Sequence, residues 1–284
     1  MLFRSALEGL RLSHHQTVFW FVLVWGAAAN LAAVIGMLQA RLIPRWDGAA
    51  AWLSKTRDLG VRYLVENTAT SSSNQIRLYA VGFILGLAAV GYIQEGTLLM
   101  GPFFVIFMGI SLVTVPEAAR SLRKSTRHLW RYCIIVGIGL TAAALAWGVI
   151  LEVALPRGLG ALLLHQGKWE AAYSLVPWMV LSMMGATGVA GATAGLRALG
   201  AAKRSMRVNL IATATYIFLG VAGALVHGVY GSVEGTALAT WIAAVLYWRQ
   251  LRIGLREYSA SLEDQAAPNS TVRPIGVAQG HKTA

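Results

Sequence analysis

Long apolar runs alternate with short polar connections along most of the chain. Each run is about 20 residues long, the length that a helix needs to cross the hydrocarbon core of a bilayer. The runs are continuous rather than alternating over ~10 residues, so the pattern favours helices over the strands of a membrane barrel. The sequence therefore predicts an all-α, polytopic helical membrane protein with about seven transmembrane helices. The expected spans are 17–38, 61–86, 97–115, 132–155, 171–196, 208–226 and a last one that ends near Trp248.

The stretch 61–91 departs from this pattern, because its first half is strongly polar and its second half is almost wholly apolar. On a helix, Glu66, Thr70, Ser73 and Arg77 recur at steps of three and four residues and so share one face. Ionisable groups at membrane depth are costly, and they mark a pathway or a binding site. We therefore expect this face to look into a helix bundle or a water-filled cavity.

Hydrogen bonding between helices is the alternative account of these polar residues. Such bonds stabilise membrane bundles by about 0.6–2 kcal/mol each, and they would explain Thr68, Ser71 and Ser72. Glu66 and Arg77 are explained less well, because they lie roughly 16 Å apart along a helix and cannot pair directly. Each needs another partner, and the Arg77 guanidinium is suited to an anionic group such as a phosphate.

Composition and charge support a membrane protein. The chain is 56% hydrophobic and 13% charged, whereas a soluble domain carries about 25% charged residues. The formal net charge is +12, but the basic residues lie in the connections, where they set topology and contact anionic lipids, so no nucleic acid is expected as a partner. Most of them follow the first, third, fifth and last spans. This predicts a multi-pass protein of the cytoplasmic (inner) membrane with a cytoplasmic C-terminus.

Four segments are expected along the chain. The interfacial linker is predicted from its mixture of tryptophans and cations, and the tail is predicted to be disordered because it is polar and lacks periodicity. Short connections are expected at Gly91–Gly96 and, as a tight turn, at Gly228–Gly235. An odd number of spans that starts outside suggests a piece of something larger. The segments are an N-terminal segment with the first transmembrane helix (1–40), an interfacial cytoplasmic linker (41–60), a six-helix membrane lobe (61–256) and a cytoplasmic tail (257–284).

Motifs for covalent chemistry are absent from the sequence. It contains no HExxH, GxSxG, Walker or GxGxxG pattern, and its histidines have no ligand spacing. We therefore expect no enzyme activity, catalytic residue, metal or cofactor. Cys133 lies inside an apolar run and is expected to pack there, and Glu117 with Arg120 is expected to form an exposed ion pair. Helix-spaced glycines in GATGVAGATAG, 185–195, predict close helix packing, or alternatively a segment that bends during transport.

Residues 74–92, NQIRLYAVGFILGLAAVGY, carry a family resemblance. They resemble the first helix of the C-terminal lobe of the polysaccharide biosynthesis (oligosaccharide flippase) family, part of the MATE-like multidrug/oligosaccharidyl-lipid/polysaccharide exporter superfamily. That family's pattern is Asn-Gln, an acidic residue, apolar residues up to Gly, then Leu-Gly and Gly-Tyr. Pro116–Arg120 resembles the closure of the family's next helix, and the likeness runs from roughly Leu59 to Leu255. Arg77 stands where the family commonly has an acidic residue, which argues against carboxylate-based ion coupling at that position.

The resemblance implies a transporter that flips lipid-linked oligosaccharide or exports polysaccharide across the cytoplasmic membrane. It implies one lobe of a two-lobed fold, with a homodimer or a separate N-terminal-lobe partner completing it, and membrane lipids as partners. The alternatives are an ion-coupled multidrug or metabolite antiporter, with Glu66 carrying the charge, and a non-transporting half-length membrane subunit of a polysaccharide synthesis complex. The residues expected to bind substrate are Glu66, Thr70, Asn74, Gln75 and Arg77.

Overall fold

A computed structural model describes residues 18–40, 49–159 and 173–266. Its elements within these ranges are helices, with no strand among them, which confirms the predicted all-α class. The chain divides into two units, Met1–Arg57 and Asp58–Ala284, and each is described by itself. Five helices of the described ranges are long and apolar enough to cross a membrane, as a multi-pass membrane protein requires. They are Val22–Gln39, Leu87–Lys124, Thr126–Arg157, Val176–Ala198 and Ala202–Glu263.

The first unit contains helix α2 (Val18–Ala40), which agrees with the predicted first span. The amide of Asn30, in the middle of this helix, donates to the backbone carbonyl of Gly26 at 2.8 Å, so this polar group is satisfied within the helix. Helix α3 (Ala49–Leu85) begins in this unit and continues into the second. The expected linker 41–60 is therefore helical from Ala49 onward and continuous with the next predicted span, while 41–48 lie outside the described residues.

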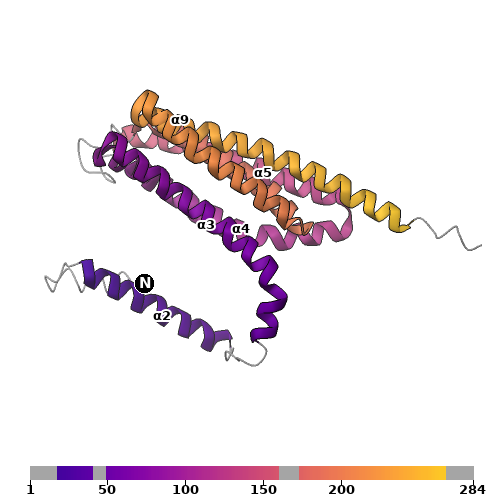
Figure 1. Ribbon diagram of the computed structural model, residues 1–284. Coiled ribbons are helices and arrows are strands. Elements are labelled where there is room, and N and C mark those ends of the chain that lie inside the picture. The colour runs from indigo at the N-terminus through magenta and orange to yellow at the C-terminus, as the bar shows by residue number, and fades with distance from the viewer. Residues whose placement is uncertain (1–17, 41–48, 160–172, 267–284) are drawn as a thin grey trace, which may run out of the picture. The chain divides into compact units, whose positions relative to one another are not determined.

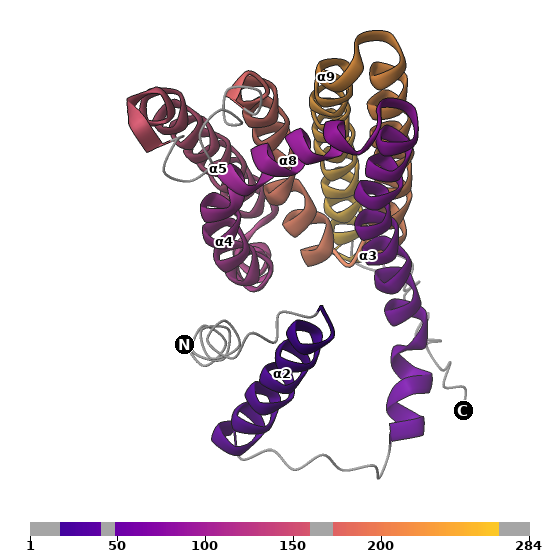
Figure 2. The ribbon, with the colours of Figure 1, turned by 90° about the vertical axis from the view of Figure 1, so that its left-hand side faces the viewer.

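The break after α3 falls earlier than the sequence suggested. Gly86 has a φ of 87° and separates α3 from α4 (Leu87–Lys124), and Figure 2 shows the sharp turn of the chain at this point. The expected connection at Gly91–Gly96 is wrong, because both glycines lie inside α4. Gly86 takes a positive φ that other residues adopt only with strain. Gly96 serves packing instead, since a Cβ there would collide with the sulfur of Met179.

Helix α8 (Val176–Ala198) lies at the centre of the second unit. It packs against α5 (Thr126–Ala154) on one side and α9 (Ala202–Ala266) on the other, and α4 packs against α5 and α8. The five-residue π-helix η1 (Leu155–Leu159) extends α5. Residues 160–172 lie outside the described part of the chain.

Small residues allow α8 to approach both neighbours closely. A Cβ on Gly191 would collide with the backbone carbonyl of Cys133 in α5, and a Cβ on Gly185 would collide with Thr240 in α9. Cys133 is itself fully buried in this packing. The predicted packing roles of these glycines and of Cys133 are thus confirmed.

Helix α9 is folded back on itself. His227 and Gly228 depart from helical geometry, Gly228 with a φ of 63°, and the arms 202–226 and 229–266 lie side by side in Figure 1. The turn is shorter than the predicted Gly228–Gly235, because the chain is already helical again at Val229. The second arm continues past Arg256 to Ala266, so this part of the expected disordered tail is helical, and 267–284 lie outside the described residues.

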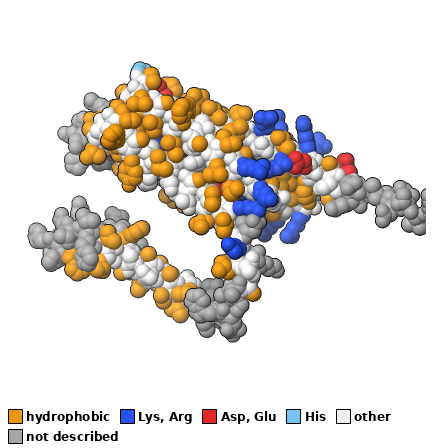
Figure 3. All heavy atoms as spheres, in the orientation of Figure 1, with side chains coloured by type: hydrophobic (Ala, Val, Ile, Leu, Met, Phe, Trp, Pro, Cys, Tyr) orange, Lys and Arg blue, Asp and Glu red, His pale blue; other side chains and the backbone are white. Residues whose placement is uncertain are grey.

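The surface of the second unit separates apolar from basic side chains. On the face seen in Figure 3, hydrophobic side chains cover most of the bundle, and Lys and Arg gather near the end from which α9 extends. Glu117 and Arg120 form the predicted ion pair at 3.2 Å, and both are exposed. An apolar girdle with a basic end is the distribution expected for helices whose connections meet lipid headgroups.

Candidate functional site

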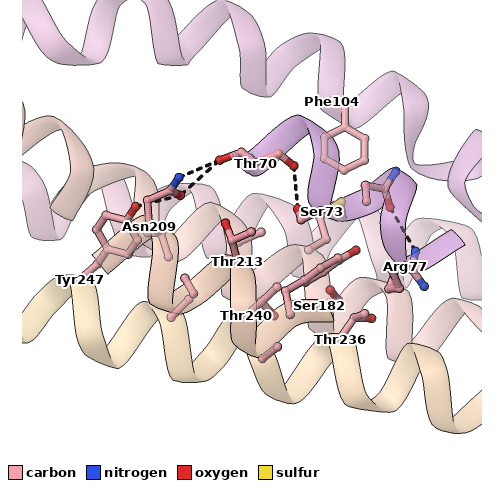
Figure 4. A pocket seen from close by; sticks show the side chains of 18 of the residues that line it. Thr70, Ser73, Arg77, Phe104, Ser182, Asn209, Thr213, Thr236, Thr240 and Tyr247 are labelled. Atoms are coloured by element: carbon pink, nitrogen blue, oxygen red, sulfur yellow. Dashed lines mark hydrogen bonds between the residues drawn. The ribbon is translucent and has the colours of Figure 1, made fainter. Parts of the chain in front are cut away.

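A cavity of about 710 Å³ lies between α3, α4, α8 and both arms of α9. This volume is within the range of small-molecule binding sites, roughly 300–1,000 Å³. Its α3 wall is almost entirely polar, and α8 and α9 add hydroxyl and amide groups opposite (Figure 4). The polar lining residues are Glu66, Asn67, Thr70, Ser73, Asn74, Arg77, Thr97, Ser182, Thr193, Arg197, Asn209, Thr213, Tyr216, Thr236, Thr240 and Tyr247.

The face of α3 that the spacing predicted is the face that lines this cavity. Glu66, Thr70, Ser73 and Arg77 all contribute to its wall, because steps of three and four residues return to the same side of a helix. The Thr70 and Ser73 hydroxyls donate to the α3 carbonyls of Glu66 and Thr70, at 2.9 and 2.7 Å. A hydroxyl that donates one hydrogen bond can still accept others, so both side chains can serve a polar ligand in the cavity.

Glu66 is held by a network that joins three helices. Arg197 of α8 donates through Nη2 to Glu66 Oε1 at 3.0 Å, and the Ser205 hydroxyl of α9 lies 3.3 Å from both carboxylate oxygens. Asn209 donates through Nδ2 to the backbone carbonyl of Glu66 at 2.9 Å. The Arg197 guanidinium also stacks on the Tyr63 ring at 5.4 Å. The carboxylate is thus charge-paired and hydrogen-bonded although Glu66 is only 6% exposed.

Asn209 connects this network to the cavity. Its amide lies 3.1 Å from Thr70 Oγ1, and its Oδ1 accepts from the Tyr247 hydroxyl at 3.3 Å (Figure 4). The three residues come from α3 and from the two arms of α9. Side-chain hydrogen bonds therefore hold α3 against the bundle at this end of the cavity.

Arg77 has a different environment at the other end of the same helix face. It is 5% exposed, and it donates only to neutral oxygens, Ser232 Oγ at 3.3 Å and Asn74 Oδ1 at 3.2 Å. The Tyr216 ring lies 5.5 Å from its guanidinium carbon. Within the described ranges no carboxylate pairs with it, and its Nε has no partner. Burying an unpaired cation is costly, so binding an anion at Arg77 would be electrostatically favourable.

The charges that line the cavity leave an excess of one positive charge. Glu66 and Arg197 neutralise each other through their ion pair, and Arg77 remains. Within the described residues, no cluster of three His, Cys, Asp or Glu side chains could hold a metal ion. The arrangement can hold a monoanionic group at Arg77 and offer many hydroxyl and amide groups to a polar ligand.

Four of the five predicted site residues come together in this cavity: Glu66, Thr70, Asn74 and Arg77. The structure does not bring Gln75 there, because it lies on another side of α3 and is exposed. Sequence reasoning missed Arg197, which it placed in a basic loop, although Arg197 belongs to the last turn of α8 and pairs with Glu66. Thr193 and Arg197 are four residues apart in α8, so they share one helix face. This spacing was the one feature of the sequence that could have indicated that Arg197 faces the cavity.

Comparisons with known proteins gave no match. No family model matches the chain, and neither a curated protein nor a solved structure is similar to it.

Proposed function

We propose that this protein is a multi-pass transporter of the cytoplasmic membrane that flips lipid-linked oligosaccharide or exports polysaccharide. In this proposal α2, α3, α4, α5, α8 and the two arms of α9 are its seven spans, and the C-terminus is cytoplasmic. The support is a cavity with a polar α3 wall inside a bundle whose outer surface is apolar. Polar groups at membrane depth are expensive and serve a pathway or binding site.

The observation that carries the proposal is the buried and unpaired Arg77. A sugar attached through phosphate has the two properties that this cavity complements, an anionic group and many hydroxyls. The phosphate would bind the guanidinium of Arg77, while hydroxyls would exchange hydrogen bonds with side chains such as Thr213, Thr236 and Thr240. The cavity's single excess positive charge favours an anion over the cations that a multidrug antiporter carries.

Glu66 is poorly placed for the alternative of ion-coupled antiport. A carboxylate that carries a proton or sodium ion must release its partners in each cycle, but Glu66 is paired with Arg197 and bonded by Ser205. Breaking this pair costs about 2–3 kcal/mol, less than for a fully buried pair because the Arg197 side chain is 33% exposed. We therefore assign Glu66 to the architecture of the cavity rather than to coupling.

We propose further that a second helical bundle covers the outer side of α3, supplied by another copy of this chain or by a separate chain. Thr68, Ser71 and Gln75 are exposed in the second unit and do not line the cavity, although the surrounding helices are apolar. Polar side chains in a bilayer face protein or water rather than lipid. The mass of the complex after mild solubilisation tests this: a lone 30.4 kDa chain would refute the second bundle.

Translocation by the purified protein tests the function itself. The probe is a fluorescent polyprenyl-phosphate-linked sugar in proteoliposomes, and its transfer between leaflets is followed by a membrane-impermeant quencher. Arg77→Gln is expected to reduce the rate at least about tenfold, since hydrogen bonds to charged groups contribute about 1.5–3 kcal/mol. Arg123→Gln is the charge-matched control, because Arg123 is exposed in the last turn of α4 and does not line the cavity. Equal rates for both variants and the unmodified protein would refute the proposed role of Arg77.

A further inference from the structure

A second hollow lies outside the cavity, at the basic end of the bundle. It measures about 420 Å³ and lies between the start of α5 and the last part of α9. Thr126, Arg127 and Trp130 line it from α5, and Arg256, Ser259 and Glu263 line it from α9. None of these residues belongs to the site described above, so the hollow needs a separate explanation.

Trp130, which lines the hollow from α5, pairs with Trp248 of α9. The ring of Trp130 meets the ring of Trp248 edge to face, at 5.5 Å between centroids and 89° between planes. The Trp248 indole N–H donates to the Gly188 carbonyl of α8 at 3.1 Å, which fixes that ring. Arg252 lies over the Trp130 ring at 5.4 Å. A tryptophan beside arginines is typical of the headgroup level of a membrane protein.

The charge around this hollow, called the groove from here on, is unbalanced. Arg127, Arg252 and Arg256 are exposed, and none of them forms an ion pair with a described carboxylate. Glu263 is the one acidic residue in the lining, so the excess is positive. Nearby Arg204 differs, because it is neutralised by a two-oxygen contact with Glu257. The groove thus concentrates cations that the protein itself leaves unneutralised.

Exposed apolar side chains lie farther along the two helices, beyond the basic residues. On α5, Ile138 follows Arg127 on the same helix face, after the exposed Arg131, and is 65% exposed. On α9, Val245 precedes Arg252 and Arg256 on one face, with the exposed Arg249 between them, and is 66% exposed. A cationic groove with aliphatic side chains farther toward the middle of the bundle complements a molecule with an anionic head and hydrocarbon tails. A free phosphate ion would leave these apolar side chains unused.

We propose that this groove is a discrete binding site for one anionic phospholipid. Its phosphate lies between Arg127 and Arg256, its glycerol ester groups contact the Arg252–Trp130 stack, and its acyl chains follow α5 and the second arm of α9. Basic pockets between membrane helices bind anionic headgroups in this manner, through charge-assisted hydrogen bonds. The bound lipid bridges α5 and α9 at the end of the bundle where their charges would otherwise repel.

The test counts lipids bound to the full-length protein by native mass spectrometry, after titration with phosphatidylglycerol in detergent. The double variant Arg127→Gln/Arg256→Gln is expected to weaken the tightest binding step about tenfold, since each removes a charge-assisted contact. The control Arg123→Gln/Lys124→Gln removes the same charge from two exposed residues at the end of α4, outside the groove, and should change that step less than twofold (about 0.4 kcal/mol). Thermal unfolding of each variant verifies that the bundle is intact.

Three results would overturn the proposal. Equal losses in the two double variants would mean that lipid responds to net charge rather than to this groove. An unchanged first binding step in Arg127→Gln/Arg256→Gln would place the lipid elsewhere. Equal competition by millimolar inorganic phosphate, or equal binding of phosphatidylcholine, would show that the site selects a free anion or any lipid instead. Loss confined to the groove variant and to phosphatidylglycerol supports the site.

Discussion

The two charged residues on the cavity face of α3 lie in opposite electrostatic situations. Glu66 has a cationic partner, Arg197, and additional hydrogen bonds from Ser205, so its charge is balanced inside the protein. Arg77 is equally buried, but its partners are the neutral Ser232 and Asn74. The paired Glu66 holds α3 against α8 and α9, whereas the unpaired Arg77 can still bind an anionic ligand.

On one face of α3, Glu66 therefore has a structural role and Arg77 a binding role. A paired buried charge is stable only while its partner remains, because an isolated one is strongly disfavoured. A buried cation such as Arg77, which contacts only neutral groups, lowers the stability of the fold but raises the affinity of the site for an anion. Both Arg77 and Arg197 leave Nε without a partner, so the distinction between them is the presence of a carboxylate, not the number of hydrogen bonds.

The largest expected effect comes from removing Arg197. Arg197→Gln leaves the Glu66 carboxylate buried without its cation, and we expect a loss of ~2–3 kcal/mol, at the low end of the range for buried pairs because the Arg197 side chain is 33% exposed. Arg77→Gln is expected to change stability by less than ~1 kcal/mol, since no buried partner charge is left behind. Thermal unfolding of both variants in the same detergent measures the difference.

The double variant Glu66→Gln/Arg197→Gln is the control for this comparison. Replacing both members removes the buried charge as well as its partner, so it should recover much of the stability lost in Arg197→Gln. Equal destabilisation by the single and double variants would mean that shape, rather than charge, holds this contact. Destabilisation by Arg77→Gln as large as that of Arg197→Gln would remove the contrast between the two ends.

The polar face of α3 could be predicted because it depends on local spacing alone. Once 61–86 is helical, positions 66, 70, 73 and 77 must share a side, and a side with two charged residues must avoid lipid. The partners of these residues could not be predicted. Arg197 and Ser205 lie 131 and 139 residues from Glu66 in sequence, and their meeting depends on how α8 and α9 pack, which no pattern within one segment records.

The errors in the sequence analysis also have physical reasons. Gly86, Gly91 and Gly96 look alike in sequence, yet Gly86 alone of the three has a positive φ, and Gly96 is required for the contact with Met179. Arg197 was assigned to a loop because Lys203, Arg204 and Arg207 follow it closely. In the structure the turn comes after Arg197, at Gly200 with a φ of 68°, and this short difference moves Arg197 from the surface loop to the cavity wall.

A smaller effect is expected from crowding Arg77 without removing its charge. A Cβ on Gly220 would lie 2.7 Å from Arg77 Cδ and 3.1 Å from Thr236 Cγ2, so Gly220→Ala is expected to displace the Arg77 side chain. We expect translocation to fall about fivefold, a loss of about 1 kcal/mol in substrate contact, with little change in unfolding temperature. Gly109→Ala in α4 is the matched control, because a Cβ there meets nothing within 4 Å. Normal translocation by Gly220→Ala would show that the position of Arg77 is not critical.

The smallest effect is expected from Ser232→Ala, which deletes the hydrogen bond that Arg77 Nη1 donates to Ser232 Oγ. At 3.3 Å this bond is longer than usual, so although its donor is charged we expect a loss of only about 0.7 kcal/mol, which is about a threefold rise in the substrate concentration that gives half-maximal translocation. The maximal rate should stay unchanged, because Ser232 orients Arg77 and does not line the cavity.

Ser111→Ala is the matched control for this last variant, since the Ser111 hydroxyl donates only to the Phe107 carbonyl of its own helix. It should leave both kinetic parameters unchanged. A loss in Ser232→Ala as large as that in Arg77→Gln would contradict the positioning role, because it would mean that the hydroxyl itself contacts the transported molecule. A threefold effect on half-saturation alone would instead place Ser232 behind Arg77, with the guanidinium as the group that meets the anion.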